Sequence, residues 1–89
     1  MRDKKKTKKQ VKHAYDLKVG QSYILSDGFD HDVVKLVRDD NIGYSPELIT
    51  TYVDQSYYFD CVKMSVPEFD NLYQLFNYCK KQGYKIYET

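Results

Sequence analysis

Hydrophobic and polar residues alternate in short runs along the chain, which is the pattern of β-strands that face water on one side. Residues 21–26 contain β-forming residues, and the Asp27-Gly28 pair that follows is a strong hairpin signal. Residues 32–38 supply the returning strand, with Val34 and Leu36 on one face of it. The pattern therefore predicts a β-hairpin in this part of the chain.

The middle of the chain contains conflicting signals. Residues 39–41, Asp-Asp-Asn, are typical of a turn. Residues 45–47, Ser-Pro-Glu, suit a helix start because Ser caps helices and Pro fits the first turn. Residues 49–53, however, are mostly β-branched or aromatic, which favours a strand. We therefore predict a strand over residues 45–56, with a helix as the alternative, and a further strand over residues 57–64.

The clearest element is a helix predicted over about residues 66–82. Ser65 and Glu68 fit a capping box at its start, and Gly83 is suited to end it. Apolar residues recur at helical spacing and form one stripe, which we expect to face the core: Phe69, Leu72, Tyr73, Phe76 and Cys79. Residues 84–88 then alternate again, which predicts a final strand.

These elements, in this order, predict an α+β fold: a small antiparallel sheet of about 4–5 strands packed by one amphipathic helix in the C-terminal half. A length of 89 residues suits one domain. We divide the chain into a basic, flexible tail (1–13) and a single α+β domain (14–89). No apolar run approaches the roughly 18 residues that a membrane span requires. We therefore expect no membrane partner and a cytoplasmic location, while the sequence leaves the oligomeric state open.

The net charge of +1 conceals an uneven distribution. Residues 1–13 contain seven Lys or Arg and one acid, which gives a net charge of +6. Residues 14–89 contain seven Lys or Arg and twelve acids, which gives a net charge of −5. A dense block of lysines is suited to neutralising the phosphates of DNA or RNA. A solubilising terminus, or a contact with an acidic protein or with the chain's own body, are the alternatives. The candidate nucleic-acid-binding residues are Lys4, Lys5, Lys6, Lys8, Lys9 and Lys12.

The ten tyrosines are the other unusual feature of the composition. Exposed tyrosines stack on unpaired bases or anchor protein interfaces, although some, Tyr73 among them, are expected in the core. Tyr78 lies roughly opposite the predicted helix stripe, and Tyr87 points away from the core side of the last strand. Tyr57 and Tyr58 are neighbours on a strand, so one of them must face outward. These four tyrosines are the candidate interface residues.

Other candidate chemistry is weak. Cys61 and Cys79 are too few for a disulfide scaffold, and we expect reduced core thiols. Residues 27–32, Asp-Gly-Phe-Asp-His-Asp, do not have the spacing of a calcium loop, and we expect their acids to bind turn backbone. The four glycines are scattered, so none forms a phosphate loop. We therefore predict a protein that is not an enzyme and has no cofactor and no metal site.

Two functions follow as hypotheses. The first is a small non-enzymatic binding protein that contacts DNA or RNA through its lysine-rich tail, with exposed tyrosines adding contacts. The alternative is a protein-binding inhibitor or adaptor, for example a phage factor that blocks a host or defence protein, with an acidic, tyrosine-rich surface that meets a basic groove on the host protein. Tyrosines beside the basic tail would favour the first function, and tyrosines beside the acidic hairpin would favour the alternative.

Overall fold

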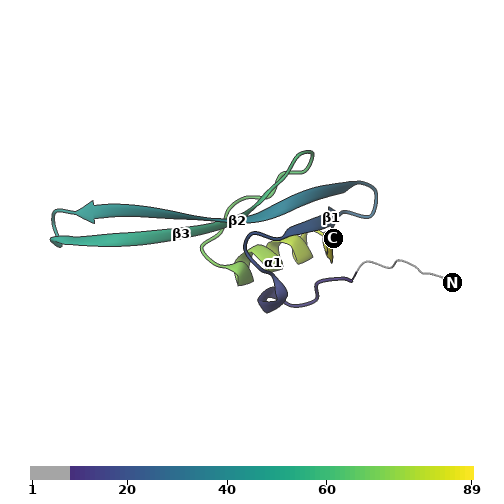
Figure 1. Ribbon diagram of the computed structural model, residues 1–89, viewed down its shortest axis with the longest axis horizontal. Coiled ribbons are helices and arrows are strands. Elements are labelled where there is room, and N and C mark those ends of the chain that lie inside the picture. The colour runs from purple at the N-terminus through teal and green to yellow at the C-terminus, as the bar shows by residue number, and fades with distance from the viewer. Residues whose placement is uncertain (1–8) are drawn as a thin grey trace.

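The structure, a computed structural model, describes residues 9–89. Its strands β1, β2, β3 and β4 pair as one antiparallel sheet in the order β3-β2-β1-β4. The helix α1 and the short 3-10 helix η1 lie on one side of this sheet (Figure 1). The elements are η1 (Ala14–Asp16), β1 (Ser22–Ser26), β2 (His31–Ser45), β3 (Thr50–Asp60), α1 (Leu72–Lys81) and β4 (Lys85–Glu88). This arrangement confirms the predicted α+β class, with one helix in the C-terminal half and a final strand after it.

The core lies between α1 and one face of the sheet. The strands alternate, and their buried side chains point to this face. Val34 and Leu36 share this face, as predicted, and both are buried, while Val33 on the opposite face is exposed. Val11 and Leu17, on either side of η1, close the core at one end. The complete set of buried hydrophobic residues is Val11, Leu17, Tyr23, Leu25, Val34, Leu36, Phe59, Leu75, Cys79 and Ile86.

The predicted first hairpin is confirmed, and the side chains of Ser26 and Asp27 accept hydrogen bonds from the backbone of its turn. The Asp27 carboxylate oxygen Oδ1 accepts hydrogen bonds from the backbone N–H groups of Phe29 (2.8 Å) and Asp30 (2.7 Å). Gly28 adopts a φ of 94°, a conformation that a residue with a Cβ rarely takes. These amide bonds also lower the pKa of Asp27.

The turn predicted at residues 39–41 is wrong, because β2 continues through these residues to Ser45. Asp39, Asp40 and Asn41 are exposed and pair with β3, so their polar side chains stay solvated without ending the strand. The chain reverses at residues 46–49 instead, between the paired residues Ser45 and Thr50. Residues 45–56 are therefore mainly strand, which confirms the predicted strand over the alternative helix. They also contain the turn between β2 and β3.

The predicted start of the helix is also wrong, because α1 begins at Leu72 and not near residue 66. Phe69 exchanges two backbone hydrogen bonds with Tyr57 (2.7 and 2.9 Å), which holds the preceding segment extended. Asn71 is the actual N-cap, and its side chain accepts a hydrogen bond from the N–H of Gln74 (2.9 Å). A second capping signal, together with strand pairing, outcompetes the Ser65 capping box. Within residues 9–89, no helix is long and apolar enough to cross a membrane.

The end of the helix follows the prediction. Gly83 has a φ of 81°, and its N–H donates to the carbonyl of Lys80 (3.1 Å). The N–H of Tyr84 donates to the carbonyl of Cys79 (2.8 Å), which completes a Schellman motif. After this reversal Tyr84 packs against the core, and the chain enters β4, where Ile86 is buried.

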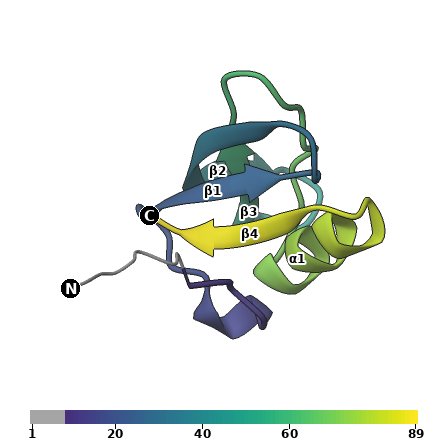
Figure 2. The same cartoon turned by 90° about the vertical axis from the view of Figure 1, so that its right-hand side faces the viewer.

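Residues 9–11, at the end of the predicted tail, pair with the outer edge of β4 (Figure 2). The N–H of Val11 donates to the carbonyl of Ile86 (2.7 Å), and the N–H of Glu88 donates to the carbonyl of Lys9 (2.8 Å). The side chain of Val11 is buried in the core. The part of the basic segment that the structure describes is therefore attached to the folded body.

Candidate functional site

The most distinctive feature is a long two-stranded arm formed by residues 39–56. β2 and β3 pair along this whole segment, from Asp39 with Ser56 to Ser45 with Thr50. β1 pairs with β2 over residues 31–35 alone, so both outer edges of the arm are unpaired within residues 9–89. The arm projects away from the sheet and α1 (Figure 1). An isolated two-stranded hairpin is marginally stable in water, so an arm of this length needs additional support.

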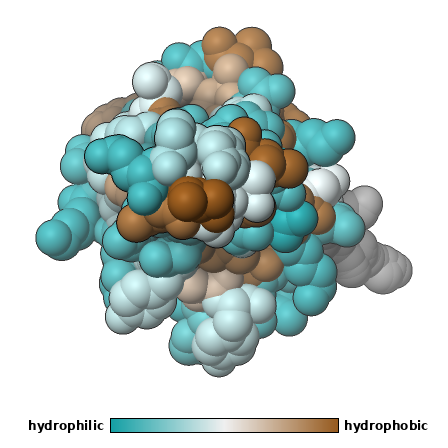
Figure 3. All heavy atoms as spheres, turned by 90° about the vertical axis from the view of Figure 1, so that its left-hand side faces the viewer, coloured by the Kyte–Doolittle hydropathy of each residue, from teal (hydrophilic) through white to brown (hydrophobic). Residues whose placement is uncertain are grey.

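The large hydrophobic side chains of the arm are exposed. Leu48 and Ile49 at the tip are 75% and 78% exposed. Ile42 and Val53 form a cross-strand pair on the face that carries Leu36 in the body, but nothing in the described chain covers them. Figure 3 looks onto the free end of the arm and shows hydrophobic side chains at its centre among hydrophilic ones. The exposed set is Ile42, Tyr44, Leu48, Ile49, Tyr52 and Val53.

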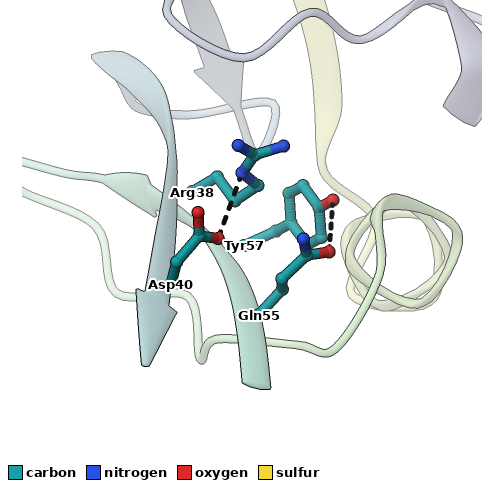
Figure 4. A network of polar contacts seen from close by, with 4 residues as sticks. All are labelled: Arg38, Asp40, Gln55 and Tyr57. Atoms are coloured by element: carbon teal, nitrogen blue, oxygen red, sulfur yellow. Dashed lines mark hydrogen bonds and ion pairs between the residues drawn. The ribbon is translucent and has the colours of Figure 1, made fainter. Parts of the chain in front are cut away.

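The arm is also acidic. It contains Asp39, Asp40, Glu47 and Asp54 and no Lys or Arg, a net charge of −4. At its base, the Arg38 Nε atom lies 3.3 Å from Oδ1 of Asp40 (Figure 4). Both side chains are more than 40% exposed, so this surface ion pair contributes little stability. The arm therefore presents hydrophobic side chains surrounded by carboxylates.

A close cross-strand contact orders the outer half of the arm. Gly43 pairs with Tyr52, and the tyrosine ring lies over the glycine in the space that a Cβ would occupy. A glycine in a strand has no side chain to pack, and an aromatic neighbour that covers it restores part of the lost contact. At the tip, Ile49 adopts a φ of 51°, which is unusual for a β-branched residue.

The four predicted interface tyrosines are half-buried, and the structure does not bring them together as one set. Tyr57 and Tyr58 lie at the base of the arm, where the Tyr57 hydroxyl donates to the Gln55 side chain (3.4 Å; Figure 4). Burial and the neighbouring Asp39 carboxylate raise the pKa of Tyr58. The predicted outward orientation of Tyr78 is wrong, because its ring packs on Phe69 with centroids 5.4 Å apart.

The remaining predicted residues lie on the body of the protein. Tyr87 lies in β4 between Ile24 of β1 and Gln10. Lys9 and Lys12 are exposed on the segment beside β4. Lys4, Lys5, Lys6 and Lys8 lie outside the described residues. Tyr73, predicted as a core residue, is 68% exposed, whereas Leu75, which is not in the predicted stripe, is buried.

Two candidate residues from the sequence, Asp32 and Cys61, take part in the packing and hydrogen bonding of the fold. Asp32 is buried, and its Oδ2 atom accepts hydrogen bonds from the backbone N–H groups of Val62 (2.9 Å), Lys63 (2.8 Å) and Met64 (3.0 Å). These bonds lower the pKa of Asp32 despite its burial. Burial raises the pKa of the free thiol of Cys61 to about 11, which leaves it protonated at neutral pH.

The arm was not identified as a site from the sequence. The signal present was the alternation of Ile42 and Tyr44 with polar residues and glycine, which continues beyond the acidic residues that predict a turn. Among residues 9–89, no group of three or more His, Cys, Asp or Glu side chains is arranged to hold a metal ion. Comparison of the chain with protein-family models, curated proteins and solved structures finds no match.

Proposed function

We propose that this protein is a non-enzymatic inhibitor or adaptor that binds a partner protein through the arm. The observation that carries this proposal is the exposure of the six large hydrophobic side chains of the arm. Exposed apolar patches on a projecting element are typical of protein interaction sites. A bound partner would also supply the support that a two-stranded arm lacks in water.

The charge of the arm indicates the chemistry of the partner surface. A net charge of −4 opposes contact with nucleic-acid phosphates and also opposes the pairing of two identical arms. A groove with an apolar floor and a rim of Lys and Arg complements both the hydrophobic side chains and the negative charge of the arm. The unpaired edges of β2 and β3 add backbone donors and acceptors, which allow such a groove to extend the ribbon by one strand.

Site-specific photo-crosslinking tests this proposal. A photoreactive residue at Leu48, on the tip, is compared with one at Phe29, which is 91% exposed on the other hairpin. In extract tested both before and after nuclease treatment, we expect one protein adduct from position 48 and none from position 29. Equal adducts at both positions, or nucleic acid as the main adduct, would contradict the proposal.

Substitution then measures the contribution of the tip. With the crosslinked protein in purified form, Ile49→Asp is expected to weaken binding by about thirtyfold or more, as for a central interface anchor. Phe29→Asp is the matched control, because it introduces the same charge at another strongly exposed apolar residue. Hydrogen exchange of α1 and β1 should be identical in the two variants, and equal loss of binding in both would contradict the assignment.

A further inference from the structure

A second surface, on the body of the molecule and away from the arm tip, contains two grooves along α1 (Figure 1). The first groove lies between the N-terminal segment and the C-terminal half of α1, and Lys12, Lys80 and Lys85 line it. Lys80 also lines the second groove, together with Lys81. No Asp or Glu lines either groove. The two grooves therefore share Lys80, and both are lined by positively charged side chains.

The second groove combines these lysines with aromatic rings. Tyr73 lines it and is 68% exposed, so one face of its ring is free to stack on a planar group. Phe69 and Tyr78 line the same groove and are packed on each other with rings tilted by 44°. The groove therefore has one exposed aromatic side chain together with a packed aromatic pair.

We propose that these grooves bind single-stranded nucleic acid, at a site separate from the arm. Proteins that bind single strands combine a cationic groove for the phosphates with aromatic side chains on which unpaired bases stack. Here Lys12, Lys80 and Lys85 provide the first element, and Tyr73 provides the second. Lys12 also follows a basic stretch of sequence, since residues 1–8 contain five Lys or Arg and one acid.

Other polyanions would use a different part of this surface. The bases of a duplex are stacked within the helix, so a duplex would contact the lysines without using Tyr73. Polyphosphate, an anionic vesicle or the acidic arm of a second copy would likewise depend on charge alone. The contribution of Tyr73 therefore distinguishes a single strand from these occupants.

Fluorescence anisotropy with the full chain tests the aromatic contribution. For a labelled oligothymidylate, Tyr73→Ser is expected to reduce affinity by about five- to hundredfold, the range for one lost base stack. Tyr15→Ser is the matched control, because Tyr15 is 78% exposed and lines neither groove. Binding of a duplex of the same length and of polyphosphate should be unchanged by Tyr73→Ser.

The salt dependence of binding tests the lysines. The triple variant K80Q/K81Q/K85Q is expected to reduce the log–log salt slope by about 2, since each phosphate contact on a single strand contributes about 0.7. K18Q/K35Q/K63Q removes the same charge from exposed lysines outside both grooves and should leave the slope almost unaltered. Thermal unfolding of all variants verifies that they are folded.

Three outcomes would overturn the proposal. The first is an oligothymidylate affinity that Tyr73→Ser does not reduce. The second is equal loss of salt slope in the two triple variants, which would place the contacts elsewhere. The third is a protein that binds duplex, polyphosphate or anionic vesicles as tightly as the single strand. None of these outcomes bears on the arm, because neither groove is lined by residues 39–56.

Discussion

At the scale of single residues, Asp32 joins two parts of the chain that are distant in sequence. It lies in β2, and its carboxylate binds three consecutive backbone N–H groups of the loop that follows β3. Charged acceptors form stronger hydrogen bonds than neutral ones, and unpaired buried amides are costly. This one carboxylate therefore holds residues 62–64 against the sheet.

Replacing Asp32 should destabilise the protein in a pH-dependent way. Asp32→Asn is expected to lower the free energy of unfolding at pH 7 by about 1.5–3 kcal/mol, the range for hydrogen bonds to a charged group. The folded-state pKa of Asp32 lies below the ordinary value of 3.8, so its contribution is present above that pH. The contribution is lost as the pH falls through the folded-state pKa, because protonation then removes the charge in both states.

Urea unfolding at several pH values measures this effect. The difference between the wild type and Asp32→Asn should be constant from neutral pH to about pH 5 and should shrink below pH 4. Asp30→Asn, an exposed neighbouring carboxylate, is the control and should cost little. A difference that stays constant down to pH 2 would show that charge is not the source of the stability.

At the scale of elements, the sequence predicted the hairpin, the final strand and the end of the helix, because local residues determine them. The Asp27-Gly28 turn and the Gly83 C-cap depend on backbone conformations that glycine favours. The start of α1 depended on the pairing of Phe69 with Tyr57, a contact between residues distant in sequence. The sequence itself contained the correct cap, Asn71, but not the information to prefer it over Ser65.

The arm escaped prediction for a related reason. Alternation of Ile42 and Tyr44 with polar residues and glycine looks the same whether a second layer covers the strand or not. Burial depends on what packs above the strand, and α1 is too short to extend over the arm. Hydrophobic periodicity therefore indicated the strands, but it could not show that their outer half is uncovered.

The contact between Tyr52 and Gly43 should control the order of the arm. Tyr52→Ala removes the ring that covers Gly43, and we expect faster amide hydrogen exchange in residues 40–45 and 50–55. Exchange in β1 and α1 should not change, because neither contacts this pair. Tyr44→Ala is the control, since Tyr44 pairs with Thr51 on the other face. Equal acceleration in both variants would mean that general loss of aromatic area, and not this contact, is responsible.

At the scale of the whole molecule, the net charge of +1 is the sum of separated regions. The arm carries −4 without a single basic residue, and the grooves along α1 are lined by lysines without an acid. The sequence predicted the separation of a basic tail from an acidic body. It could not predict that Lys80, Lys81 and Lys85 join the basic side, because the C-terminal end of α1 meets the N-terminal segment through the tertiary fold.

Because the two surfaces share no residue, substitutions in them should have independent effects. The double variant Ile49→Asp/Tyr73→Ser is expected to lose partner binding as Ile49→Asp does and oligothymidylate binding as Tyr73→Ser does. Effects at distant sites usually add within about 0.5 kcal/mol. Titration of each ligand in the presence of the other measures this directly, and a larger coupling would show that the two sites communicate.

Because β2 is one continuous strand, it fixes the distance between the arm tip and the body of the protein. β2 runs from Asp32, beside the core, to Ser45, near the tip, so the distance between the two surfaces is determined by the number of residue pairs in the ribbon. Adding two residues to each strand would move the tip outward by about 7 Å and keep Ile42 and Val53 on their present face. Adding one residue to each strand would present them on the opposite face. The length of the arm can therefore change in steps of two residues per strand without changing the face that presents Ile42 and Val53.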